Sequence, residues 1–311
     1  MKDKDLLSIS DLSSIDIHLL LADAVELRAD GWVDTLAGKT LALLFEKPAL
    51  RTRMSFELAV RQLGGECIYL SPAEVGLGHR ESAKDVAGVL SRYADVLAVR
   101  TFAQETLLEL ARYADVPVIN ALSDHEHPCQ ALADLLTIFD HKESLKGISL
   151  AYIGDGNNVA RSLTLAGALV GMDMRIATPP GYALDERTIE LAKEYAQESG
   201  ASIMTTTDPR LAVREAEVVY TDTWVSMGQE KENEKRLKDF AGFQVTRELM
   251  ALSAVDAVFM HCLPAHRGQE VADEVMDSRA SVVLDQAENR LYAQKAVLAQ
   301  MLGGAEIPSH R

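Results

Sequence analysis

Two arginines separated by a threonine, Arg51-Thr52-Arg53, form the part of this chain best suited to hold an anion. They follow the apolar run 41–45 and Pro48, which breaks the extended segment. Apolar residues at positions 56, 59, 60 and 63 then have the spacing of one buried helical face. The arginines therefore fall near a helix N-terminus, where free backbone N–H groups favour a phosphate. The alternative is a solvated first turn that carries two surface arginines.

A second candidate site is the run His125-Glu126-His127-Pro128-Cys129-Gln130, which follows another apolar run. Pro128 can begin a helix, so that His127 and Gln130 would both face a ligand at the helix start. A zinc site built on the two histidines and Cys129 is a weaker hypothesis, because no second cluster has partner spacing. Helix capping without any ligand is the structural alternative.

The segment Gly154-Asp155-Gly156-Asn157-Asn158 links an apolar run to a helical pattern. It matches neither the dinucleotide fingerprint nor the phosphate loop of nucleoside triphosphatases. Asn157 and Asn158 suit the carboxylate of a polar ligand, or else they cap the helix.

Two further motifs follow apolar runs near the end of the chain. In 261–268, Cys262 has histidine and arginine neighbours and is either a substrate-contacting thiol, a nucleophile or a small buried side chain. In 222–228, Asp222 and Ser226 could hold an ammonium group and close over it, although a solvated loop fits too. The mixed-charge run 231–238 is predicted to be a solvated helix face.

The elements that must position these motifs alternate between short apolar runs and helical patterns, which predicts an α/β fold with two doubly wound parallel sheets. Ligands of such sheets bind beyond the carboxyl ends of the strands, where every motif above falls. The join is expected within 128–142, and a final helix over 290–302. The predicted strands are 41–45, 67–70, 96–99 and 116–119 in the first sheet, then 148–153, 174–177, 202–205, 218–220, 257–260 and 282–284 in the second.

Composition narrows the class of protein. The 311 residues suit two domains, and 48% apolar residues suit full cores. The net charge of −16 argues against binding to nucleic acid or to an anionic membrane. Three widely spaced cysteines, an N-terminus without an apolar signal segment and the lack of a long apolar run predict a cytoplasmic protein.

Taken together and in this order, the motifs resemble the aspartate/ornithine carbamoyltransferase family from about Leu41 to Arg290. The resemblance implies transfer of a carbamoyl group from carbamoyl phosphate to the δ-amine of L-ornithine, with no metal or other cofactor. It implies domains at 1–142 and 143–290, a helix over 291–311 that packs on the first domain, an active site in the cleft between domains, and a homotrimer or an assembly of trimers.

The resemblance also implies roles for individual residues. Arg100, His127 and Cys262 would act in catalysis, His127 by polarising the carbonyl oxygen. The phosphate and carbamoyl groups would be bound by Arg51, Thr52, Arg53, Arg100, His127 and Gln130. Ornithine would be bound by Asn158, Asp222, Ser226, Met227, Cys262, the carbonyl of Leu263 and the backbone of Arg290.

Two departures from the family pattern concern phosphate binding. Ala49 and Leu50 stand where the family usually has hydroxyl residues, and Gly76 stands where many members have a glutamine that reaches a neighbouring subunit. His79 or Arg80 is a candidate replacement for that glutamine. Rival functions are carbamoyl transfer to putrescine or to an acylated ornithine, and ligand binding without catalysis.

Overall fold

A computed structural model describes residues 1–76, 81–226, 228 and 230–303. The chain divides into two compact units, Met1–Leu136 with Glu288–Arg311, and Thr137–Ala287. Helices α6 (Pro128–Lys142) and α13 (Val283–Leu302) each run through a boundary between the units. Within the described residues, no helix has the length and apolar character needed to cross a membrane.

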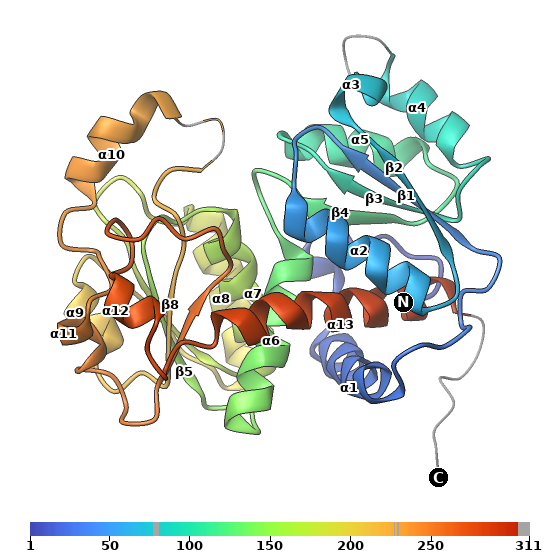
Figure 1. Cartoon of the computed structure of the whole chain (residues 1–311). Helices are drawn as coiled ribbons and strands as arrows, with labels where there is room; N and C mark the ends of the chain where they lie inside the picture. The colour runs from blue at the N-terminus through green and yellow to red at the C-terminus, as the bar shows by residue number, and fades with distance from the viewer. Residues whose placement is uncertain (77–80, 227, 229, 304–311) are drawn as a thin grey trace. The chain divides into compact units, whose positions relative to one another are not determined.

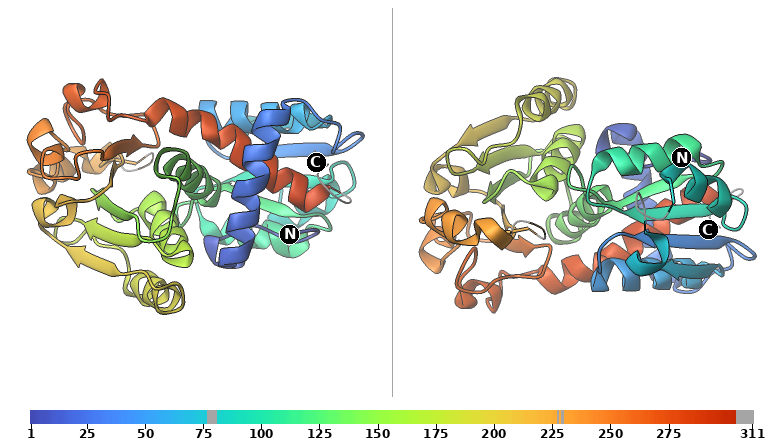
Figure 2. Two further views of the ribbon diagram at one scale, coloured as in Figure 1. Left: turned by 90° about the horizontal axis from the view of Figure 1, so that it is seen from below. Right: turned by 90° about the horizontal axis from the view of Figure 1, so that it is seen from above.

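The first unit is built on a parallel sheet with the strand order β2-β1-β3-β4. Figures 1 and 2 show α4 and α5 on one face of this sheet and α1 and α2 on the other. Covered faces explain why β1 is buried from Leu41 to Phe45 rather than alternating. The elements are η1 (Ile9–Asp11), α1 (Ser14–Asp30), β1 (Thr40–Phe45), α2 (Leu50–Gln62), β2 (Glu66–Leu70), α3 (Pro72–Val75), α4 (Ala83–Leu90), β3 (Val96–Arg100), α5 (Gln104–Tyr113) and β4 (Val118–Leu122).

The second unit is built on a five-stranded parallel sheet in the order β7-β6-β5-β8-β9. Its central strand β5 is buried throughout. The elements are β5 (Ser149–Ile153), α7 (Asn158–Val170), β6 (Asp173–Ala177), α8 (Glu186–Ser199), β7 (Ile203–Thr206), α9 (Pro209–Val213), β8 (Val218–Thr221), η2 (Glu230–Glu232), α10 (Asn233–Asp239), α11 (Arg247–Met250), β9 (Val258–His261) and α12 (Asp273–Met276).

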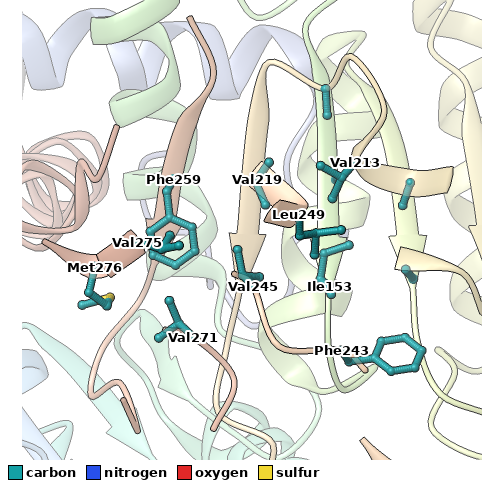
Figure 3. Close-up of a cluster of buried hydrophobic side chains, with 14 of the residues drawn as sticks. Ile153, Val213, Val219, Phe243, Val245, Leu249, Phe259, Val271, Val275 and Met276 are labelled. Atoms are coloured by element: carbon teal, nitrogen blue, oxygen red, sulfur yellow. The ribbon is translucent and has the colours of Figure 1, made fainter. Parts of the chain in front are cut away.

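A hydrophobic core fixes the strands that end at the candidate site in the second unit. Figure 3 shows Ile153 of β5, Val219 of β8 and Phe259 of β9 facing side chains from α9, α11 and α12. The core members Ile153 and Phe259 are fully buried, each within a few residues of a motif named above. This packing holds the carboxyl ends of the strands in fixed positions.

The predicted fold class is confirmed, since both sheets are parallel and the strand and helix runs alternate as expected. One predicted strand, 282–284, is wrong. Val282 donates its N–H to the carbonyl of Phe259, but its own carbonyl then accepts from Gln286 and begins α13. The backbone thus makes a single bridge, between Phe259 and Ser281, before it turns into the helix.

Candidate functional site

In the first unit, the hydroxyl of Thr52 receives two guanidinium groups. Thr52 lies in the first turn of α2 and is 1% exposed. Its Oγ1 accepts hydrogen bonds from Nη1 of Arg100 at 3.1 Å and from Nη2 of Arg290 at 2.8 Å. Both acceptor positions of the hydroxyl are then used, so its own proton is left to donate to a ligand.

Arg51 adds a third guanidinium at the same turn. Its Nε is buried and has no hydrogen-bond partner among the described residues. Free N–H groups at the start of a 13-residue helix add positive potential. Three arginines, a hydroxyl donor and a helix N-terminus have the charge and the hydrogen-bond donors that suit a compact dianion.

The structure places Arg53 elsewhere, although the sequence grouped it with Arg51 and Thr52. The Nε of Arg53 donates to Glu57 at 2.6 Å, and its guanidinium lies 3.8 Å from the ring centre of Tyr69. Its side chain is 46% exposed. Arg53 therefore does not join the group formed round Thr52 in this structure.

His127 and Gln130 provide a buried hydrogen-bond donor and a buried acceptor in the same unit. His127 is 4% exposed, and burial, then Arg290, Arg100 and Lys47, hold its pKa well below the usual value. The imidazole is consequently neutral and can donate one hydrogen bond without carrying charge. Gln130 donates through Nε2 to Asp134 at 2.8 Å, which leaves its buried Oε1 without a partner among the described residues. That oxygen can accept from an amino group.

Lys47 belongs to this group; the resemblance included it in the motif Phe45-Glu46-Lys47-Pro48 but implied no separate role for it. It is 7% exposed, and its Nζ lies 4.6 Å from the ring centre of Phe102. Burial first, and then the Arg100 charge, lower the pKa of Lys47 to about 8. Its place between the apolar run 41–45 and the arginines could have indicated a role.

Lys47 should make anion binding depend on pH. Above a pKa of about 8 the amine is neutral, so the affinity for carbamoyl phosphate should fall as pH rises. If only the charged form binds, the decrease between pH 7 and 9 is about tenfold. Calorimetry with carbamoyl phosphate alone measures this, and Lys47→Met should flatten the profile. An unchanged profile in that variant would rule out Lys47 as the titrating group.

In the second unit, Asp222 joins two of the predicted motifs. Asp222 follows β8 and is 5% exposed. Its Oδ1 accepts the S–H of Cys262 at 3.1 Å, and its Oδ2 accepts from Nδ2 of Asn157 at 2.7 Å. Asn157 also caps α7, because its Oδ1 accepts the N–H groups of Val159 and Ala160. The capping alternative is therefore confirmed for Asn157, while Asn158 begins α7.

The turn after β9 has an unusual backbone held by a buried histidine. Leu263 has φ +59°, which is uncommon for a residue with a Cβ. Its N–H donates to Nδ1 of His261 at 2.9 Å, while Nε2 of His261 lies 3.1 Å from Oε1 of Glu270. Asp222, His261 and Cys262 form the only group near enough for a metal ion among the residues that the structure describes. Both ring nitrogens of His261 already have hydrogen-bond partners within the protein, which favours a hydrogen-bonded cluster over a metal site.

The thiol of Cys129 does not favour the zinc hypothesis. Burial raises its pKa to about 12, and its Sγ lies 3.7 Å from the carbonyl oxygen of Asn120. A metal site would need the thiolate. His125, the other member of that hypothesis, is exposed.

The prediction of a solvated helix face over 231–238 is wrong for Arg236. Nη1 of Arg236 donates to Oδ2 of Asp155 at 2.8 Å and to the carbonyl of Trp224 at 2.9 Å. Arg236 and Asp155 are each 7% exposed. Burial raises the pKa of Asp155, and the Arg236 guanidinium opposes that shift. The pair joins the loop after β5 to the segment after Asp222, which carries the half-buried Ser226.

Three residues named in the sequence analysis, Met227, His79 and Arg80, lie outside the residues that the structure describes.

The chain matches two family models that together span nearly all of it. The carbamoyl-P binding domain of aspartate/ornithine carbamoyltransferase matches residues 4–140, and the Asp/Orn binding domain matches residues 146–301. The chain belongs to the aspartate/ornithine carbamoyltransferase family, whose members are carbamoyl-transferring enzymes.

Individual relatives and solved structures that the chain resembles are named as ornithine carbamoyltransferases. The ornithine carbamoyltransferase of Pyrococcus abyssi is 50% identical over 310 residues, which is 98% of each chain. The solved structure of ornithine carbamoyltransferase from Pyrococcus furiosus has a TM-score of 0.94 at 49% identity and covers 98% of this chain and 99% of its own. The ornithine transcarbamoylase of Giardia lamblia has a TM-score of 0.89 at 34% identity, with 98% and 100% covered.

Proposed function

We propose that this enzyme transfers the carbamoyl group of carbamoyl phosphate to the δ-amine of L-ornithine, which gives L-citrulline and phosphate. The observation that carries the proposal is the Thr52 hydroxyl bound by Arg100 and Arg290, within a unit that also holds a neutral, buried His127. Arginines suit the phosphate, and His127 and Gln130 suit the carbonyl oxygen and the amino group of the carbamoyl function.

The residues of the second unit support ornithine as the acceptor. The buried Asp222 carboxylate suits the α-ammonium, and Asn158 at the start of α7 suits the α-carboxylate. We propose that Ser226 and Met227 close over this end of ornithine. Cys262, the carbonyl of Leu263 and the backbone of Arg290 would orient the δ-amine.

The proposed reaction needs no covalent enzyme intermediate. The neutral δ-amine forms a bond to the carbonyl carbon, and the resulting tetrahedral oxyanion is stabilised by His127 and the arginines. The C–O bond to phosphate then breaks, and the departing phosphate takes the amine proton. These side chains supply the required charge stabilisation, so the proposal includes no metal. A quantitative test is the yield of citrulline and phosphate, which should be formed in a ratio of one to one.

Cys262 is a contact residue in this mechanism and not a nucleophile. Its thiol donates to Asp222, and the proposal assigns that carboxylate to the α-ammonium of ornithine and not to the removal of the thiol proton. We expect Cys262→Ala to lower the rate, and no thiocarbamate to form on the wild-type protein. A burst of phosphate with a trapped adduct on Cys262, detected by mass spectrometry, would overturn this assignment.

Replacing Ala49 by serine should strengthen phosphate binding. Ala49 is the N-cap of α2 and makes no side-chain cap hydrogen bond. A serine would cap the helix, which is worth about 0.5–2 kcal/mol, and would offer the anion a hydroxyl worth about 0.5–1.5 kcal/mol. We expect a higher melting temperature and a lower KM for carbamoyl phosphate.

A matched control for Ala49→Ser is Ala272→Ser. Ala272 is the uncapped N-cap of α12 in the second unit. It should raise stability without changing that KM. An unaltered KM in Ala49→Ser would mean that the arginines and backbone groups already saturate the anion.

We propose that the protein forms a homotrimer or an assembly of trimers, and that it acts in arginine metabolism in the cytoplasm. An exposed apolar stripe supports association, since Leu50, Met54 and Leu58 of α2 are 76%, 50% and 37% exposed at four-residue spacing. Free cysteines at 67, 129 and 262 fit a reducing compartment. We retain 1–142 with 291–311 as the carbamoyl-phosphate domain and 143–290 as the ornithine domain.

A further inference from the structure

Glu126, the residue before His127, has a buried carboxylate bound by the N-terminal segment. Its side chain is almost fully buried, at 1% exposure. Oε1 accepts the hydroxyl of Ser8 at 2.6 Å, and Oε2 accepts the N–H of Ile9 at 2.9 Å. Residues more than a hundred positions apart are thus joined directly beside the proposed catalytic imidazole.

The N-terminal segment is itself fixed along β4, the edge strand of the first sheet. Leu6 donates its N–H to the carbonyl of Val118 at 2.9 Å and accepts from the N–H of Asn120 at 2.8 Å. Nδ2 of Asn120 donates to the carbonyl of Leu7 at 2.9 Å. Because these bonds run along the strand, the segment meets Glu126 from a rigid support.

The main chain of Glu126 is held from within its own turn. Its N–H donates to Oγ of Ser123 at 3.1 Å, and its carbonyl accepts the N–H of Ser123 at 3.0 Å. Oγ of Ser123 in turn donates to Oε1 of Gln104 at 2.5 Å. The backbone carbonyl of the next residue, His127, accepts the N–H of Gln130 and so begins the hydrogen bonds of the helix.

We propose that Glu126 is a positioning residue for His127, and that the N-terminal segment 5–9 is thereby a working part of the carbamoyl-phosphate site. The role assigned to Glu126 is geometric, since its carboxylate joins the turn before the imidazole to the N-terminal segment. A buried carboxylate is costly unless it is hydrogen-bonded, and both of its oxygens accept a bond from this segment. The inference rests on the proposed carbamoyl transfer.

The test compares Glu126→Ala with Glu126→Gln and with Ser13→Ala. Misplacement of a catalytic group by about 1 Å costs up to about a hundredfold in rate, so Glu126→Ala should lower kcat by about ten- to a hundredfold. The KM for ornithine should stay within about twofold, since no ornithine contact changes. Glu126→Gln keeps one acceptor and should retain more of the rate. Ser13 caps α1 away from this turn, so Ser13→Ala reports the effect of lost stability alone.

Hydrogen exchange gives a readout that does not depend on activity. The amides of His125 and Glu126 both donate to Oγ of Ser123 and should exchange faster in Glu126→Ala, while the amides of β1 stay protected. If Glu126→Ala does not fold, Ser8→Ala removes one of the two bonds to the carboxylate and should lower kcat by less than the full effect.

The outcomes distinguish a failure of the inference about Glu126 from a failure of the proposed function. Wild-type citrulline formation with an unchanged kcat in Glu126→Ala, or an equal loss in Ser13→Ala, overturns the inference and leaves the proposed function intact. A wild type that forms no citrulline overturns the proposed function instead. The exchange experiment then still decides whether Glu126 fixes the turn.

Discussion

Replacing His127 by alanine is expected to lower kcat by about 10²–10³-fold, the loss typical of removing one oxyanion donor. The imidazole is buried and neutral, because burial and three neighbouring cations hold its pKa well below the usual value. A neutral donor can strengthen its hydrogen bond as charge develops on the carbonyl oxygen. The KM for carbamoyl phosphate should change less than kcat, since the arginines bind the phosphate in both states.

His125→Ala is the matched control for His127→Ala. His125 is an exposed histidine two residues earlier in the same turn, and its removal should leave kcat nearly unchanged. Steady-state assays with circular dichroism to confirm folding make the comparison. Equal losses in both variants, or wild-type kcat in His127→Ala, would contradict the assigned role.

Replacing Arg236 by methionine is expected to destabilise the second unit by about 3–5 kcal/mol, because it leaves a buried carboxylate without its cation. The carboxylate is that of Asp155, 2.8 Å from Nη1 of Arg236. The carbonyl of Trp224 would also lose its donor. Since these contacts join the loop that carries Asn157 to the segment after Asp222, the KM for ornithine should rise as well.

Two variants control for the effect of Arg236→Met. The double variant Arg236→Met, Asp155→Asn should recover most of the lost stability, because no buried charge remains. Lys235→Met removes a neighbouring cation whose side chain is 74% exposed, and it should change stability little. Urea unfolding measures all three. A double variant no more stable than Arg236→Met would show that the ion pair is not the reason for the loss.

Local sequence patterns were enough to predict where the site motifs fall. A strand that is buried on both faces appears in the sequence as a short apolar run, and the end of that run predicts where the strand ends. The motifs at 51–53 and 222–228 therefore come after β1 and β8 as expected, and the motif at 261–268 begins at the last residue of β9. The false strand 282–284 shows the limit, since an apolar run cannot distinguish a strand from the first turn of a buried helix.

Pairings between distant residues could not be predicted from spacing. Arg236 was placed on a solvated face because its neighbours are charged, yet its partner Asp155 lies 81 residues earlier. Arg290 was given only a backbone role toward the amine, whereas its side chain donates to Thr52, 238 residues away. The partners of Glu126 are similarly remote. Each of these contacts depends on the tertiary fold and leaves no periodic signal.

The central claim is that this chain uses carbamoyl phosphate and free L-ornithine, and acceptor specificity tests it most directly. Initial rates of carbamoyl transfer are measured with L-ornithine, putrescine and N-acetylornithine at saturating carbamoyl phosphate. N-acetylornithine would leave the buried Asp222 without its ammonium partner, and putrescine lacks the α-carboxylate proposed to lie at the start of α7, so kcat/KM should favour ornithine by at least about a hundredfold. A higher kcat/KM for putrescine or N-acetylornithine, or no carbamoylated product from any of the three, would contradict the account.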